Sequence, residues 1–175
     1  MKQIPLKKLV FSGVFLALCI ILPYFTGHIP QIGSALSPMH IPVLICGFIC
    51  GAPYAALIGF IAPILGYFIN GMPPLMPIGL SMAFEMATYG IASGLLHTIL
   101  PKKSIYLYVS LILSMLVGRA VWGIASVILF SLQGKAFTFQ LFLSGAFINA
   151  IPGIICHILI IPPLVIGIKK SHFLN

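Results

Sequence analysis

The stretch GLSMAFEMATYGIASGLL, Gly79–Leu96, contains Glu85, the single acidic residue of a 175-residue chain. Hydrophobic residues make up 61% of the chain and charged residues only 6%, whereas soluble domains are about 45–50% apolar and about 25% charged. So few charges cannot cover a water-exposed surface. The sequence therefore predicts an integral membrane protein, folded as a single compact domain over residues 1–175.

Positive charge marks the ends of the apolar segments. The net charge is +8, and the flanking lysines are Lys2, Lys7, Lys8, Lys102, Lys103, Lys169 and Lys170. No long basic run or basic-aromatic stripe accompanies them, so the pattern favours topology signals over a nucleic-acid partner. The four cysteines lie in apolar runs, where free cysteine behaves as a small hydrophobe, and the sequence offers no clear metal-ligand set.

A bilayer core requires about 20 apolar residues per span, and this length is used to divide the apolar runs into helices. Gly51–Pro53 interrupts the longest run as a turn, and Pro152, Pro162 and Pro163 are expected to bend or shorten the last helix. The predicted helices cover roughly 8–25, 40–51, 53–70, 78–100, 105–132 and 138–168. The sequence thus predicts an all-α fold, an integral membrane six-helix bundle.

Six spans place both termini on one side of the membrane. That side then carries the seven flanking lysines, and the opposite side carries only Lys135. By the positive-inside rule, the termini and the loop Pro101–Ser104 are expected to be cytoplasmic. A ligand pocket reached from the other side would open to the outside.

Three polar side chains are predicted to lie at a similar depth. With a rise of about 1.5 Å per residue, Glu85 lies about 10 Å, Asn149 about 16 Å and Arg119 about 20 Å from the outer ends of their helices. Tyr89 follows Glu85 by four residues and Trp122 follows Arg119 by three, so each charge shares a helix face with an aromatic ring. Aromatic walls with a few polar groups are typical of a small-molecule pocket.

A structural alternative is a plain ion pair between Glu85 and Arg119 that holds the bundle together; such a pair could also line a pocket. His40 opens the second helix near the outer face and could reach a ligand or anchor at the interface. Asn70 could accept a hydrogen bond from a ligand or cap its helix. His157 is interpreted as a satisfied core histidine rather than a ligand contact.

Small residues recur four positions apart, which lets helix backbones approach closely. In the first helix they are Gly13 and Ala17, and in the fourth they are Gly90 and Gly94. Packing inside the bundle is the default interpretation. The first-helix pair could instead form a docking surface for another subunit.

With these residues assembled, the chain resembles a substrate-binding S component of an energy-coupling-factor (ECF) transporter, over essentially its whole length. The basic N-terminus, the six spans and the Gly13/Ala17 pair carry the resemblance. So do SPMHIPVLICGFICGAPYAALIGFIAPIL, Ser37–Leu65, and NGMPPLMPIGLSMAFEMATYGIASGLL, Asn70–Leu96. The resemblance implies a cup that binds a vitamin or related micronutrient at the cell membrane of a prokaryote.

The same resemblance implies partners and roles. An S component works with a coupling membrane subunit, which the small residues of its first helix meet, and with two cytoplasmic ATPases. The family usually has alanine at both first-helix positions, whereas glycine stands at Gly13 here. Loops Gly27–Pro38 and Asn70–Pro77 would cover the ligand. The chain has no GxxxxGK[ST] loop of its own, so the ATP site must lie in a partner.

The ligand class depends on whether the two charges pair. If Glu85 and Arg119 are paired, the pocket is nearly neutral and favours a flat heterocycle, such as hydroxymethylpyrimidine or a pyridoxine-like vitamer. Trp122 and Tyr89 could stack on such a ring. An unpaired Arg119 would instead favour a carboxylate such as pantothenate.

Two other functions are less consistent with the sequence. A self-contained secondary carrier or channel would need coupling groups along a through-path, and the cytoplasmic half has no acidic residue. A membrane enzyme is disfavoured because carboxylate-based catalysis usually needs two or more acidic groups. No catalytic residue, cofactor or metal ligand is predicted.

Overall fold

The structure, a computed structural model, describes residues 6–26, 36–101 and 103–171, and every regular element in these ranges is helical. The elements in chain order are α1 (Leu6–Ile21), η1 (Leu22–Thr26), α3 (His40–Ile49), α4 (Ala52–Asn70), η2 (Leu75–Gly79), α5 (Leu80–Ile99), α6 (Ser104–Leu132), α7 (Phe139–Leu143), η3 (Ser144–Ile148) and α8 (Ile151–Lys170). The prediction of an all-α fold is confirmed for this part of the chain.

Five helical segments within the described ranges are long and apolar enough to cross a membrane. They are Leu6–Phe25, Ala52–Asn70, Leu75–Ile99, Ser104–Leu132 and Phe139–Lys170. Their exposed surfaces consist largely of aliphatic and aromatic side chains, which suit contact with lipid rather than with water. The chain is therefore a multi-pass membrane protein.

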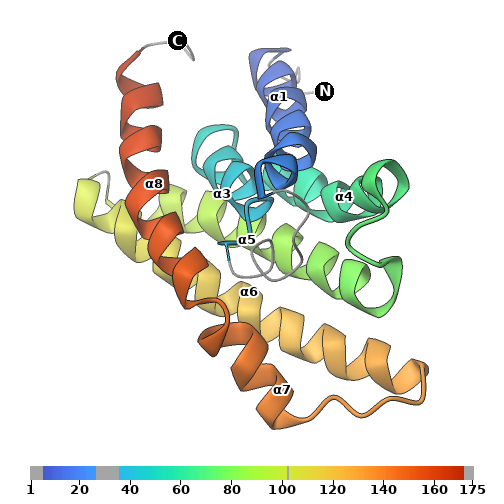
Figure 1. Cartoon of the computed structure of the whole chain (residues 1–175). Helices are drawn as coiled ribbons and strands as arrows, with labels where there is room; N and C mark the ends of the chain where they lie inside the picture. Colours follow the sequence, from blue (N-terminus) through green and yellow to red (C-terminus); the bar gives the residue numbers. More distant parts are fainter. Residues whose placement is uncertain (1–5, 27–35, 102, 172–175) are drawn as a thin grey trace.

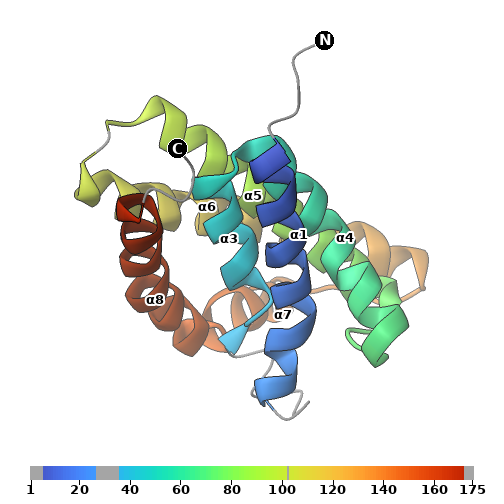
Figure 2. The same ribbon diagram turned by 90° about the horizontal axis from the view of Figure 1, so that it is seen from above.

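The remaining predicted helix, α3, is short and central. Its ten residues span about 15 Å, roughly half of a bilayer core, and all of them except Ile41 are buried. It ends at the predicted turn, where Gly51 has φ +101° and α4 begins at Ala52. Because that backbone conformation strains any residue with a Cβ, glycine is needed there. In Figures 1 and 2, α1 and α3 lie side by side between α8 and α4.

Contacts between α1 and α3 show that the chain reverses direction between these two helices. Ser12 Oγ lies 3.9 Å from Cys46 Sγ, while Cys19 Sγ donates to the carbonyl oxygen of Met39 at 3.4 Å. α1 and α3 are therefore antiparallel. α5 and α6 form the next long hairpin, which crosses the bundle at a large angle to α1 and α8 (Figure 1).

Glycines bring the backbones of α4 and α5 almost into contact. A Cβ added to Gly94 would lie 2.3 Å from the backbone nitrogen of Ala52, and one added to Gly90 would lie 2.5 Å from the carbonyl carbon of Ala55. The small residues that recur in the fourth predicted helix thus pack inside the bundle, as the default interpretation expected.

Two glycine-to-alanine substitutions are expected to have opposite effects. Gly94→Ala should lower the free energy of unfolding by about 1–3 kcal/mol, because the new methyl group forces α4 and α5 apart. Gly167→Ala in α8 should raise it by up to about 1 kcal/mol, because alanine is the better helix former and nothing lies within 4 Å of its Cβ. Denaturant unfolding in detergent measures both. A Gly94→Ala protein as stable as the wild type would contradict the close α4–α5 packing.

One end of the bundle gathers the ends of several helices. The Phe48 ring at the end of α3 packs edge-on against the ring of His97 in α5, with 5.6 Å between centroids, and Lys169 Nζ of α8 contacts Nε2 of His97. The described start of α1 lies at this end too (Figure 1). Among the flanking lysines, Lys2 and Lys102 lie outside the described residues.

The last predicted helix is interrupted. Helical structure over the predicted range 138–168 is divided into α7, η3 and α8, with a break at Asn149 and Ala150. Pro152 lies in the first turn of α8, where it needs no backbone N–H partner, whereas Pro162 and Pro163 lie inside that helix. Of the three prolines, Pro152 is the one at the break. The break sets where α8 begins, and α8 forms one wall of the site described next.

Candidate functional site

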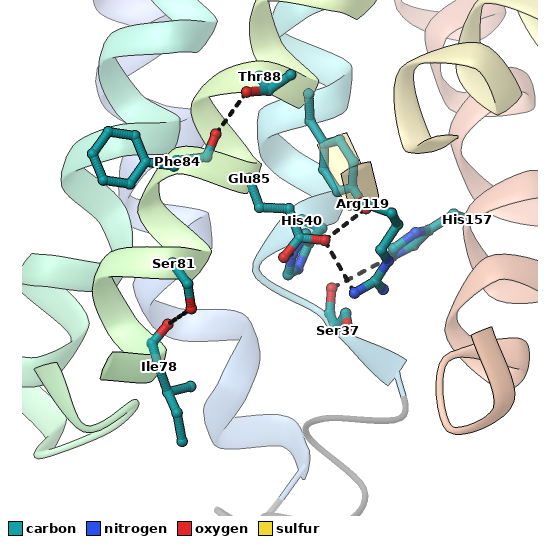
Figure 3. Close-up of polar contacts among 10 residues, drawn as sticks. Ser37, His40, Ile78, Ser81, Phe84, Glu85, Thr88, Arg119 and His157 are labelled. Carbon is teal, nitrogen blue, oxygen red and sulfur yellow. Dashed lines mark hydrogen bonds and ion pairs between the residues drawn. The ribbon is translucent and has the colours of Figure 1, made fainter. Parts of the chain in front are cut away.

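Glu85 of α5 and Arg119 of α6 form a buried ion pair. Nη1 of Arg119 lies 3.0 Å from Oε1 of Glu85, and the two side chains are 12% and 2% exposed. The hydroxyl of Tyr89 donates to the same carboxylate oxygen at 2.8 Å. Nε2 of His40 lies 3.6 Å from the other oxygen, Oε2, which is beyond hydrogen-bond length. Figure 3 shows His40, Glu85 and Arg119 converging from different helices.

This arrangement explains how one carboxylate is accommodated among apolar helices. A buried charge without a partner is very costly, whereas a paired and hydrogen-bonded one is tolerated. Arg119 supplies the opposite charge and Tyr89 supplies a hydrogen bond. The two side chains that the sequence predicted to share a depth do meet, and their combined charge is zero.

A cavity of about 150 Å³ lies beside the ion pair, between α5, α6, η3 and α8. Its polar lining residues are Tyr89, Arg119 and His157. The apolar lining residues are Ile112, Met115, Leu116, Ala146, Phe147, Ile154 and Ile158. An apolar cavity of about 150 Å³ accommodates a ligand the size of benzene, so the dimensions suit a molecule with a single ring.

Tyr89 is held in this wall by a glycine on the facing helix. A Cβ added to Gly118 of α6 would lie 2.1 Å from the Cδ1 and Cε1 atoms of the Tyr89 ring. One edge of the ring therefore packs closely against the α6 backbone while its hydroxyl reaches Glu85. This packing places the ring, Glu85 and Arg119 in one connected unit.

Two buried histidines extend the polar region. Nε2 of His157 in α8 lies 3.4 Å from the carbonyl oxygen of Ser37, just before α3. The His40 and His157 ring centroids are 6.3 Å apart, and His40 meets the Tyr89 ring edge-on at 5.4 Å. Neither ring nitrogen of His40 has a hydrogen-bond partner among the described residues.

The placement of His157 adds to the sequence-based interpretation. The residue is buried, as expected of a core histidine, but its ring also forms part of the cavity wall. Its rotation follows from where α8 begins after the break at Ala150. The sequence predicted one continuous helix over this range. It therefore could not indicate the rotation of α8 or the direction in which His157 faces.

Of the seven predicted ligand contacts, only Tyr89 and Arg119 line this cavity; the other five, which are Glu85, His40, Trp122, Asn149 and Asn70, do not. Trp122 stacks on Phe142, with 6.2 Å between ring centroids, in a cluster of aromatic side chains on α6 and α7. Asn149 is exposed, and its Nδ2 donates to Ser144 Oγ at 3.1 Å. Asn70 accepts a hydrogen bond from the Tyr24 hydroxyl.

The first-helix pair lies on the outer side of α1. Gly13 and Ala17 are both exposed, and a Cβ added to Gly13 would meet nothing within 4 Å. The buried side of the helix instead carries Ser12, Phe15 and Cys19. Residues 27–35, most of the loop predicted to cover the ligand, lie outside the described residues.

The fold and the cavity define a multi-pass membrane protein with an internal site of small-molecule size. A comparison with protein families matches residues 7–165 to the ECF transporter, substrate-specific component. The chain therefore belongs to this family, and the resemblance inferred from the sequence is confirmed. Its members are substrate-specific transporter subunits rather than enzymes. Searches among curated proteins and among solved structures found no match.

Proposed function

We propose that this subunit captures a small, neutral heterocycle from outside the cell. Hydroxymethylpyrimidine and pyridoxine-like vitamers are the best candidates. The observation that carries the proposal is the Glu85–Arg119 ion pair at 3.0 Å beside a cavity of about 150 Å³. The captured molecule would then pass inward through a complex with a coupling membrane subunit and two cytoplasmic ATPases.

Charge supports a neutral ligand over pantothenate. Arg119 lines the cavity, but its charge is balanced by Glu85. A ligand carboxylate would have to be desolvated in an apolar pocket without a free cation to compensate it, which costs far more than burying a neutral ring. Size agrees, since an extended acid such as pantothenate needs more room than a cavity suited to one ring.

The distribution of charge supports a definite orientation. Lys7 and Lys8 lie in the first turn of α1, and Lys169 and Lys170 end α8 at the same end of the bundle. The positive-inside rule makes this the cytoplasmic end. The start of α3, with Ser37 and His40, would then face outward. In this orientation the chain passes through the bilayer region six times, counting α3, in the cell membrane of a prokaryote.

Measuring uptake of radiolabelled hydroxymethylpyrimidine and pyridoxine in proteoliposomes tests the proposal. We expect ATP-dependent uptake when the subunit is reconstituted with its coupling subunit and both ATPases, and none when it is reconstituted alone. Mass spectrometry of small molecules released from the purified, denatured protein would identify the native ligand independently. Uptake by the subunit alone would favour a self-contained secondary carrier. Release of an anionic compound such as pantothenate would contradict the neutral-ligand assignment.

A further inference from the structure

The hydrogen bond between His157 and Ser37 determines which nitrogen of His157 is available to a ligand. A carbonyl oxygen can only accept, so Nε2 of His157 must carry the proton that is donated to the Ser37 carbonyl. In a neutral imidazole the other nitrogen then has a free lone pair. The His157 ring lines the cavity, so Nδ1 is the nitrogen left to accept a hydrogen bond from a bound molecule.

His40 adds a second unsatisfied group close by. It is only 2% exposed, and both of its ring nitrogens lack a hydrogen-bond partner in the part of the chain that the structure describes. Buried polar atoms without partners are costly. The 6.3 Å between the His40 and His157 centroids is too short for a ring stacked between them, which needs about 7 Å at normal contact distances. His40 is not among the residues that line the cavity, and its Nε2 lies 3.6 Å from Oε2 of Glu85.

Arg119, which lines the same cavity, provides the complementary chemistry. Its guanidinium group has five N–H donors, and the contact with Glu85 is made through Nη1. The cavity thus presents an acceptor at His157 and donors at Arg119, with no net charge. A neutral ring that carries an amino or hydroxyl group beside a ring nitrogen offers the matching donor and acceptor.

We propose that His157 is a specificity-determining binding residue, and that its Nδ1 accepts a hydrogen bond from an amino or hydroxyl substituent of a one-ring ligand. This inference rests on the proposed function, because it assumes that the cavity is the ligand site. It goes beyond that function by assigning the residue that selects the substituent.

Two probes that differ by one hydrogen-bond donor test the assignment. 4-Aminopyrimidine carries an exocyclic amino group, and pyrimidine is the same ring without it. In equilibrium dialysis of the detergent-solubilised protein at millimolar probe, we expect 4-aminopyrimidine to bind about tenfold more tightly. Equal binding of the two probes, or no binding of either, would overturn the proposal.

Two variants separate ligand contact from structural support. His157→Gln places its amide nitrogen near the Nε2 position, so it keeps a donor for Ser37 but loses the acceptor at Nδ1. His157→Asn places an oxygen near the Nδ1 position and gives up the Ser37 contact. We expect the tenfold preference to fall to about one in His157→Gln and to persist in His157→Asn. Pyrimidine, which lacks the donor, should bind equally to all three proteins and so reports an intact cavity.

Other outcomes refute the proposal in distinguishable ways. His157 would have only a structural role if His157→Gln kept the full preference for 4-aminopyrimidine over pyrimidine. The same conclusion would follow if both variants lost affinity for the two probes equally. Uptake by the complete transporter is measured separately. If wild-type uptake is normal while the probe preference is absent, the transport function stands and the role of His157 fails. If the probe preference is present and uptake is absent, the role of His157 stands and the transport function fails.

Discussion

Replacing Glu85 with glutamine is expected to lower the free energy of unfolding by about 3–5 kcal/mol while leaving the bundle assembled. Glutamine has nearly the same shape and can still accept from Tyr89, so packing changes little. The charge of Arg119, however, would be left buried and uncompensated. Thermal unfolding in detergent measures the loss. Ligand binding should weaken as well, because Arg119 lines the cavity and is held in position by Glu85.

A double substitution tests the cause. In Glu85→Gln/Arg119→Met both charges are gone, and replacing a buried ion pair by uncharged groups is often neutral for stability. We therefore expect the double variant to regain most of the lost stability. It should not regain binding, because methionine cannot donate hydrogen bonds to a ligand. A Glu85→Gln protein with wild-type stability would show that Arg119 does not depend on Glu85 for charge compensation.

Helices and turns were predictable because their signals are local. The bilayer requires long apolar segments, which are visible in the sequence, and Gly51, with its positive φ, ends the run that includes α3. The pairing of Glu85 with Arg119 was also within reach, since two lone opposite charges in lipid are strongly driven to meet. These predictions needed only the sequence positions and the cost of isolated charges.

The composition of the cavity wall was not predictable in the same way. His157 faces the cavity because α8 starts anew after the break at Ala150, and Trp122 turns to its aromatic neighbours on α7. Both orientations depend on how short helical pieces pack against α6. The rise along an ideal helix placed Asn149 at a depth similar to that of Glu85 and Arg119. Depth alone, however, does not say which side of an interrupted helix a residue occupies.

A neutral site inside a membrane protein has a consequence for binding. Because Glu85 and Arg119 compensate each other, entry of a neutral ring changes no net charge in the low-dielectric interior. Selectivity must then come from shape and from unsatisfied hydrogen-bonding groups, and a site built to pair such groups rejects analogues that lack them. Nδ1 of His157 meets that requirement, whereas Tyr89 already donates its hydroxyl proton to Glu85.

Gly13→Leu is expected to reduce uptake by the complete transporter about tenfold or more, without changing ligand affinity of the isolated subunit. We propose that the outer side of α1 docks onto the coupling subunit, where small residues permit close backbone approach. A leucine there would separate the two helices and cost the complex about 1–3 kcal/mol, or about tenfold per 1.4 kcal/mol. Within the subunit there is open space for the new side chain to start from, since a Cβ at Gly13 has nothing within 4 Å.

Gly167 provides a matched control for this substitution. It is also a helical glycine on an exposed surface, and a Cβ built there likewise meets nothing within 4 Å. Gly167→Leu should therefore leave binding and uptake unchanged if only the α1 surface docks. Equal loss of uptake in both variants would point to a general effect of bulky residues in lipid-facing helices. Normal uptake by Gly13→Leu would exclude α1 from the docking surface, because close approach cannot tolerate that side chain.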